Sequence, residues 1–275
     1  MILIDISQIS IACIMVSSSS LKKELDENLV KHMILTSLLE LKLKFGREFG
    51  DMVICADGRN NWRKNVFPYY KASRKKDRDD NFIDWTNLYK AIESFKTDLK
   101  ANFPYKVIQL DDAEADDIIA VLSKNAKEQT LICSSDKDFK QLQQYKNISQ
   151  YCPRKKKMMD VDDPQRELKE LVIRGDVSDG VPNIRSDSDT FMDKSKRQLP
   201  ITVKLLEELF KEIPDELQEN YKRNDQLINF ENIPMDIQNR ILAEYDIPAL
   251  GNKQKIYQYF MNNKMKNLLQ SIGKF

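Results

Sequence analysis

The chain has 275 residues, of which 44 are Lys or Arg and 43 are Asp or Glu, so its formal net charge is +1. This length suits one large domain or two small ones, and it can bury a hydrophobic core without disulfides or structural metals. A charge near zero argues against a uniformly basic nucleic-acid-binding surface. The 32% of charged residues nevertheless leaves room for separate acidic and basic patches.

Cysteine and histidine are both scarce. The four cysteines are widely spaced and form no C-x-x-C pair, so we expect free thiols in a reducing, cytoplasmic compartment. The apolar N-terminus is interrupted by Asp5 and is too short to span a bilayer, so we expect no membrane association. A Ser-His-Asp triad or a His-rich zinc site would have to use His32, which lies in a run with helical periodicity. Carboxylates are therefore the expected catalytic groups.

Short apolar runs alternate with longer periodic segments through the first 150 residues, as in β-α units around a parallel sheet. The predicted strands are Ile2–Ile4, Met52–Cys55, Tyr105–Gln109, Leu131–Cys133 and Ile148–Tyr151. Helices are predicted between them at 30–47, 84–101, 114–126 and 138–144. After Pro164 the periodicity is helical, at about 165–174, 201–211, 215–228, 235–244 and 253–271. We therefore predict an α/β domain over 1–163 and a helical domain over 164–275.

Acidic residues follow four of the predicted strands. They are Asp5, Asp57, Glu114, Asp116, Asp117, Asp136 and Asp138. Because the carboxyl ends of parallel strands line the ligand crevice of an open sheet, we expect these acids to converge. Helix N-capping is an alternative that explains Asp5 or Asp57 singly, but it does not explain the runs E-A-D-D and D-K-D.

Carboxylates packed this closely repel one another unless cations neutralise them, and Mg²⁺ suits such oxygen ligands. A pair of ions can support in-line displacement at phosphorus without a histidine. The sequence therefore predicts metal-dependent phosphodiester hydrolysis, although a phosphatase with similar acids would satisfy the same pattern.

Residues 59–80 combine cationic and aromatic side chains. The set comprises Arg59, Arg63, Lys64, Lys71, Arg74, Lys75, Lys76 and Arg78, with Trp62, Phe67, Tyr69 and Tyr70 between them. Cations neutralise phosphates and aromatic faces stack on unpaired bases, so the segment favours single-stranded nucleic acid. A solvated basic loop is the alternative.

A tight turn carries two further acids after the predicted helix at 165–174. Asp176 and Asp179 lie between Gly175 and Gly180, which suit a helix end and a turn. The segment is either a plain linker between helices or a return to the metal site that completes it.

Several motifs together resemble the 5′-nuclease superfamily of flap endonucleases and 5′–3′ exonucleases. They are LIDISQI, ICADGRNNWRKNVFPYYKASRKK, DDAEADDIIAVL, SSDKDFKQL and RGDVSDGV, in the family's order and spacing. Within the superfamily the chain is most similar to the ribonuclease H branch of T-even bacteriophages, along nearly its whole length. The resemblance implies a parallel-sheet domain of the PIN/5′-nuclease type with helices on both faces. It also implies a helical C-terminal part with a helix-turn-helix-like element that binds duplex DNA.

The resemblance implies an enzyme that removes RNA primers and adjacent DNA from lagging-strand fragments, with two Mg²⁺ ions that Mn²⁺ can replace. It implies principal metal ligands at Asp5, Asp57, Asp116, Asp136, Asp138 and Asp179, with Glu114, Asp117 and Asp176 supporting them. It also implies that Lys71 and Arg63 act on the scissile phosphate from an arch over the site, beside a stacking Tyr70. Implied substrates are RNA–DNA hybrids, 5′ flaps and nicked or forked duplexes.

The loop Asn183–Ser188 lacks the glycines with which most superfamily members grip duplex phosphates, so we expect no monovalent-cation site there. Single-strand-binding protein and the sliding clamp are implied partners, although we expect no clamp-recruiting peptide before the first strand. We expect a monomer. Two other functions stay open: a PIN-like endoribonuclease, and an inactive scaffold that binds branched DNA.

Overall fold

The fold is built on one six-stranded sheet. The computed structural model describes residues 1–21, 27–72, 85–193 and 195–275. The strands are β1 (Ile2–Asp5), β2 (Met52–Ala56), β3 (Lys106–Gln109), β4 (Thr130–Cys133), β5 (Ile148–Cys152) and β6 (Lys157–Met158). Their order is β3-β2-β1-β4-β5-β6, and only the last pairing is antiparallel. The five strands predicted from apolar runs are confirmed.

The strand order reverses at β1, because the chain adds β2 and β3 on one side of it and β4 and β5 on the other. Ile4 pairs with Ile54 and with Cys133, so β1, β2 and β4 end at the same edge. Such a topological switch point is where open parallel sheets bind ligands.

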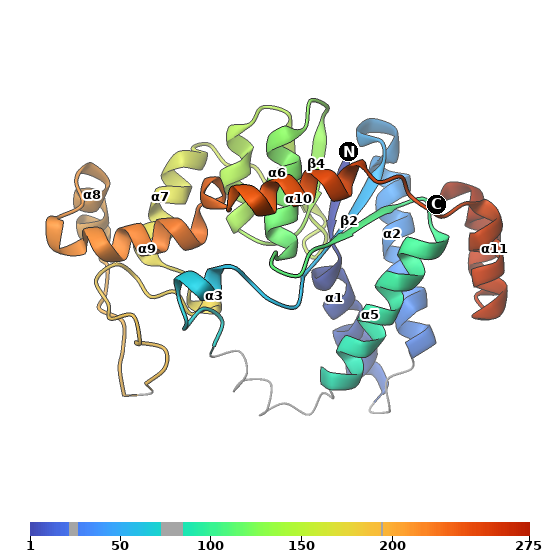
Figure 1. Cartoon of the computed structure of the whole chain (residues 1–275), viewed down its shortest axis with the longest axis horizontal. Helices are drawn as coiled ribbons and strands as arrows, with labels where there is room; N and C mark the ends of the chain where they lie inside the picture. Colours follow the sequence, from blue (N-terminus) through green and yellow to red (C-terminus); the bar gives the residue numbers. More distant parts are fainter. Residues whose placement is uncertain (22–26, 73–84, 194) are drawn as a thin grey trace.

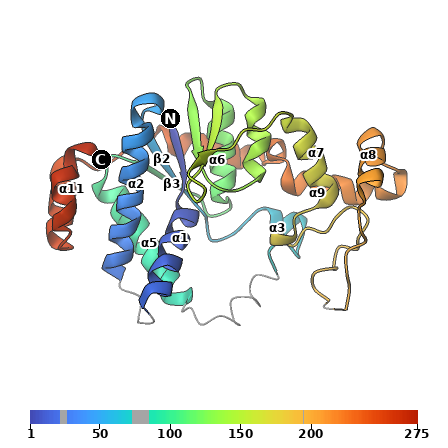
Figure 2. The same cartoon turned by 180° about the vertical axis from the view of Figure 1, so that it is seen from behind.

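Helices cover both faces of the sheet (Figures 1 and 2). Alternate residues of a strand point to opposite faces, so Ile2 and Ile4 enter one core while Leu3 enters the other. The first core includes residues of α1 (Ile6–Leu21), α2 (Glu27–Phe49), α5 (Trp85–Asn102), α11 (Lys253–Asn262) and the 3-10 helix η5 (Lys266–Lys274). The second includes residues of α6 (Ala115–Asn125), η1 (Asp138–Gln144), η4 (Phe230–Asn232) and α10 (Met235–Asp246).

Some helices of the C-terminal segment extend away from the sheet, and others pack against it. Helices α7 (Pro164–Arg174), α8 (Val203–Lys211) and α9 (Gln218–Ile228) lie to one side, with smaller hydrophobic cores of their own (Figure 1). α10 and α11 instead return to opposite faces of the sheet. A helix-turn-helix-like element is not confirmed, and the domain boundary at 163/164 stays a prediction.

Several elements differ from the sequence predictions. α1 was not predicted, because its first residues, ISQISIACIMV, are apolar on nearly every side and so show no helical stripe. The single turn α3 (Arg63–Val66) and the two-residue β6 are too short to produce a pattern. The predicted helix 253–271 is interrupted after Asn262, where Lys264 takes a left-handed backbone with a φ of 56° before η5 begins. The predicted helix 215–228 begins with the short 3-10 helix η3 (Asp215–Leu217).

All four cysteines are free and buried, as predicted. Among the residues that the structure describes, no helix is both long and apolar enough to cross a membrane.

Candidate metal centre

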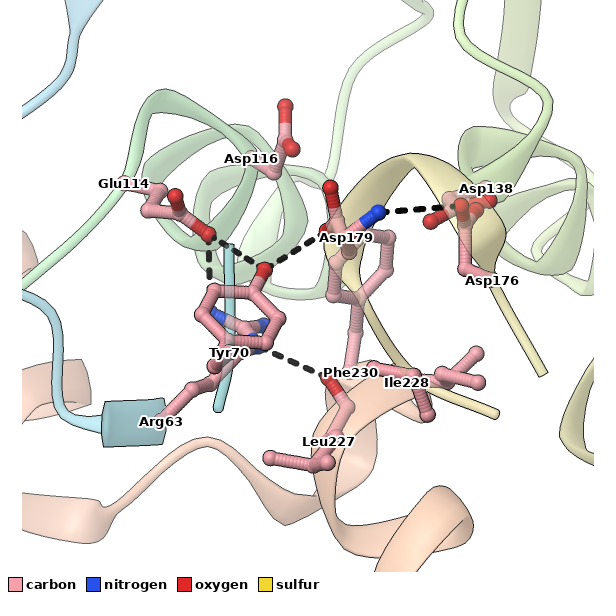
Figure 3. Close-up of a pocket in the computed structure, with 11 residues that line it drawn as sticks. Arg63, Tyr70, Glu114, Asp116, Asp138, Asp176, Asp179, Leu227, Ile228 and Phe230 are labelled. Atoms are coloured by element: carbon pink, nitrogen blue, oxygen red, sulfur yellow. Dashed lines mark hydrogen bonds and ion pairs between the residues drawn. The ribbon is translucent and has the colours of Figure 1, made fainter. Parts of the chain in front are cut away.

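Carboxylates gather at the edge where β1 to β4 end. Asp5 closes β1, Asp57 follows β2, Glu114 and Asp116 begin α6 after β3, and Asp136 and Asp138 follow β4. The short 3-10 helix η2 (Val177–Asp179) brings the last two acids, Asp176 and Asp179, to the same pocket (Figure 3). That pocket encloses only about 10 Å³, which is room for a single water or ion. It fits ions and leaves a nucleotide outside.

Burial, and then neighbouring like charges, raise the pKa values of three of these acids. Burial, followed by the charges of Asp57 and Asp136, raises the pKa of Asp5 from 3.8 to about 7. Burial, with Asp5 and Asp136 as neighbours, holds the pKa of Asp116 well above its usual range. Burial and then the charge of Asp136 do the same to the pKa of Asp138. A bound cation would remove this repulsion.

The available oxygen atoms fit a hard divalent cation. The Oδ1 atom of Asp138 is buried and has no hydrogen-bond partner among the described residues. In the parts of the chain that the structure describes, no group of three or more acidic, histidine or cysteine side chains lies so that it could hold a metal ion as it stands. Mg²⁺ tolerates this arrangement, because it usually keeps several waters and takes only one or two carboxylates directly.

Lys71 and Tyr70 bridge Glu114 and Asp179 across the pocket. The Lys71 ammonium lies 2.5 Å from Glu114 Oε1 and 3.5 Å from Asp179 Oδ2. The Tyr70 hydroxyl lies 2.8 Å from Glu114 Oε2 and 2.7 Å from Asp179 Oδ2. Burial alone would raise the pKa of Glu114, but the positive charges of Lys71 and Arg63 bring it below its usual value. Lys71 and Tyr70 therefore hold the acids from two distant segments in one place.

The backbone fixes this bridge as well. Lys71 has a φ of 55°, which is uncommon for a side-chain-bearing residue, and its N–H donates to the carbonyl of Asp179 at 2.7 Å. Gly180 has a φ of 72°, and a Cβ there would lie 3.1 Å from the carbonyl oxygen of Tyr69. The acidic turn thus packs tightly on the segment that carries Lys71.

Arg63, Trp62 and Asp117 form a buried scaffold beneath the pocket. The Asp117 Oδ2 atom accepts from Trp62 Nε1 at 3.2 Å, from the Arg63 guanidinium at 3.0 Å and from the Glu114 N–H at 2.9 Å. The second arm of the guanidinium lies 2.8 Å from Asp117 Oδ1, and Arg63 Nε donates to the Leu227 carbonyl at 2.7 Å. These contacts join the segment after β2, the start of α6 and the end of α9.

This scaffold bears on the roles expected from the sequence. Arg63 is 3% exposed, lines the metal pocket and lies 3.6 Å from Glu114 Oε2, so its action on a phosphate stays a prediction. Asp117 is 0% exposed, and its oxygens accept from Arg63, Trp62 and the Glu114 N–H, so it holds Glu114 from beneath the pocket. Trp62 and Tyr70, at 6% and 3% exposed, have no free face for a base.

Arg59 and Lys64 are exposed, and their contacts to nucleic acid stay a prediction. Arg74, Lys75 and Lys76 lie outside the described residues.

Some supporting residues were not predicted. Ser7 donates to Asp57 Oδ2 at 2.7 Å, and Gln8 Oε1 accepts from the Ser135 N–H at 2.6 Å. Gln150 Nε2 donates to the Asp136 carbonyl at 2.6 Å, and Lys137 pairs with Asp176 at 3.1 Å. Ser7 and Gln8 lie two and three residues after Asp5, and this closeness in the sequence was the one signal that could have identified them.

Comparison with known proteins decides the family. A family model of the N-terminal, resolvase-like domain of 5′–3′ exonucleases matches residues 4–170, more than half of the chain. The chain belongs to the 5′–3′ exonuclease family. A second family model, the C-terminal part of T4 RNase H, matches residues 162–275.

Individual relatives agree with this membership. Ribonuclease H of Enterobacteria phage T4 is 32% identical over 291 aligned positions, which cover 99% of this chain and 95% of the relative. A zinc-bound 5′-exonuclease of phage T5 matches with a TM-score of 0.59 at 13% identity, covering 89% of this chain and 97% of the other. A phage T5 flap endonuclease in a pseudo-enzyme–product complex with DNA and metal ions matches with a TM-score of 0.58 at 14% identity. The match covers 90% of this chain and 99% of the other. As a family member the chain is a phosphodiester-cleaving nuclease, and the T5 structures share its fold.

Proposed function

We propose that this nuclease is a Mg²⁺-dependent 5′–3′ exonuclease and flap endonuclease that removes RNA primers and adjacent DNA from lagging-strand fragments. The observation that carries the proposal is the convergence of acids at one edge of the sheet. Glu114, Asp116, Asp138, Asp176 and Asp179 line one ion-sized pocket, and the charges of Asp5 and Asp136 act on Asp116 from beside it. Proposed substrates are RNA–DNA hybrids, 5′ flaps and nicked or forked duplexes. We propose a monomer that acts in the cytoplasm of a phage-infected cell, alongside single-strand-binding protein and the sliding clamp.

Two Mg²⁺ ions, or Mn²⁺ in their place, would lie at this acidic edge, held directly or through water by Asp5, Asp57, Asp116, Asp136, Asp138 and Asp179. Glu114 and Asp176 would act on bound water. Bound metal would supply an activated water and stabilise the departing oxygen. Mg²⁺ fits the acids because all of the available ligands are carboxylate oxygens.

The protein's own residues would position the phosphate. Lys71 lies between Glu114 and Asp179, so its ammonium is the cation nearest to the expected position of the scissile phosphate and can offset charge that develops there. Tyr70 keeps Glu114 and Asp179 at a fixed separation. Arg59 and Lys64 are exposed beside this edge and would pair with neighbouring phosphates.

The test compares wild-type protein with Asp136→Asn on a 5′-labelled RNA–DNA hybrid and on a 5′ flap, with and without Mg²⁺. Asp160→Asn is the matched control, because Asp160 is exposed and far in sequence from the strand ends. We expect short 5′ products only with Mg²⁺, loss of cleavage in Asp136→Asn and normal cleavage in Asp160→Asn. Tight binding of the flap without any cleavage would favour an inactive scaffold, and internal cuts in single-stranded RNA alone would favour an endoribonuclease.

A further inference from the structure

A large groove adjoins the metal pocket on the side away from residues 59–72. It has a volume of about 1110 Å³, and its walls are α1 and α2 on one side and the segments around Ser135 and Arg154 on the other. The metal pocket itself has about 10 Å³. This groove therefore has space beside the metal edge for a ligand larger than an ion.

The groove opens onto the metal edge. Asp136 belongs to its lining, and the hydrogen bond from the Ser135 N–H to Gln8 Oε1 joins its two walls at 2.6 Å. Gln8 lies three residues after Asp5, and Ser135 lies two residues after β4. The groove thus lies outside the carboxyl ends of β1 and β4, at the switch point of the sheet.

The lining is mixed, with most of its apolar side chains on one wall and most of its cations on the other. The helical wall presents Ala12, Cys13, Met33 and Leu41, together with the polar Gln8 and Ser37 and the exposed carboxylate of Glu40. Lys44 lies at its rim, where its ammonium is 4.3 Å from the centre of the Tyr151 ring. The opposite wall carries the exposed cations Lys137, Arg154 and Lys156.

We infer that this groove binds a short single-stranded segment of nucleic acid next to the metal edge. Its bases would lie on the apolar wall of α1 and α2, and its phosphates would pair with the basic side chains across from them. A peptide or lipid would use the apolar wall but would not need a row of cations facing it. The inference rests on the proposed function and adds a second path for a strand, separate from the 59–72 segment.

The two paths lie on opposite sides of β1. Residues 59–72 follow β2, whereas the groove is bounded by the segments that follow β4 and β5. A forked substrate could thus place one unpaired strand on each side, with the metal edge between them.

Binding is tested with a fluorescent eight-nucleotide oligothymidylate in Ca²⁺, and its position with the 5-iodouracil version of the same oligonucleotide. Ala12→Glu places a charge on the apolar wall, and Met15→Glu is the matched control, because Met15 is 49% exposed on the same helix and outside the groove. Lys44→Glu removes a rim cation, and Arg47→Glu makes the same charge change on the same helix outside the groove.

We expect about tenfold weaker binding in Ala12→Glu and in Lys44→Glu than in their controls, because both changes repel phosphate. We also expect photocrosslinks within residues 8–44 or 151–156. Equal affinities within both pairs, or crosslinks confined to the 59–72 segment, would overturn the inference.

A hydrophobic dye that binds the groove and is not displaced by the oligonucleotide would overturn it too, in favour of an apolar occupant. Each variant is also assayed for Mg²⁺-dependent cleavage of a blunt hybrid that has no single-stranded tail. Failure of wild-type protein in that assay would count against the proposed function alone, since the groove is judged by affinity and crosslinking.

Discussion

Replacing Asp5 by asparagine is expected to stabilise the metal-free protein at pH 8 while abolishing cleavage. Asp5 is 8% exposed, and burial together with the charges of Asp57 and Asp136 raises its pKa from 3.8 to about 7. Above pH 7 the folded protein must therefore hold a charge that its surroundings oppose. Asparagine is nearly the same size, and its Oδ1 atom can still accept from the Gln8 N–H, a bond that measures 3.1 Å with aspartate.

The magnitude follows from linkage between protonation and folding. The difference between 3.8 and about 7 corresponds to a loss of up to about 4 kcal/mol when Asp5 ionises in the folded state. Because the pKa of Asp5 is higher in the folded state than in the unfolded state, protonated Asp5 favours the folded state. This contribution to the free energy of unfolding is fully present below about pH 4 and is lost as the pH rises to about 7. Asp5→Asn should recover it at pH 8 and gain almost nothing at pH 4.

The assay is urea unfolding in EDTA at pH 8 and at pH 4, with Asp160→Asn as the surface control. Added Mg²⁺ should stabilise wild-type protein at pH 8 more than Asp5→Asn, because binding to the folded state neutralises the same charge. A variant that is less stable than wild type at pH 8 in EDTA, or equally affected at both pH values, would refute the electrostatic reasoning.

Three further predictions concern other parts of the site. Arg63→Met should lower the free energy of unfolding by about 3–5 kcal/mol, because it leaves the buried Asp117 carboxylate without its cation. The control Lys124→Ala breaks an exposed ion pair with Glu231 and should lower the free energy of unfolding by less than about 1 kcal/mol. Similar losses of unfolding free energy for Arg63→Met and Lys124→Ala in urea unfolding would contradict a scaffold role for Arg63. Lys71→Ala should slow single-turnover cleavage more than it weakens duplex binding by anisotropy, and equal losses would make Lys71 a simple phosphate anchor. Affinity for forked DNA should fall steeply between about 50 and 200 mM salt despite the net charge of +1, because the local basic surface releases counterions when it binds phosphates. An affinity that does not change with salt would contradict a basic binding surface.

The sequence predicted the positions of acids that directly follow a strand, because the parallel topology of the sheet determines where those acids lie. Acids directly after apolar strands had to reach one edge once the strands were parallel, so the positions of Asp5 and Asp136 followed from local pattern alone. The turn at Asp176 was ambiguous, because its return to the site depends on tertiary contacts such as the packing of Gly180 on Tyr69 and the bond from Tyr70 to Asp179.

Burial of charged and aromatic residues was the part that the sequence could not show. Arg63 and Lys64 are neighbours of the same type in a basic run, yet one is 3% exposed and the other lies on the surface. The difference arises because Asp117, 54 residues away in the sequence, offers Arg63 a buried counter-charge. Such pairings depend on tertiary contacts, and residue type alone does not reveal them.

The return of α10 and α11 to the two faces of the sheet has a consequence for how the enzyme is made. β1 and β2 leave the ribosome about 200 residues before α11, so both faces of the sheet stay without part of their cover through most of synthesis. Ile256 and Phe260 complete the core that contains Ile4 and Ile54. A nascent chain in which α11 has not yet been made would therefore carry the acids of the metal centre on a sheet whose core is unfinished.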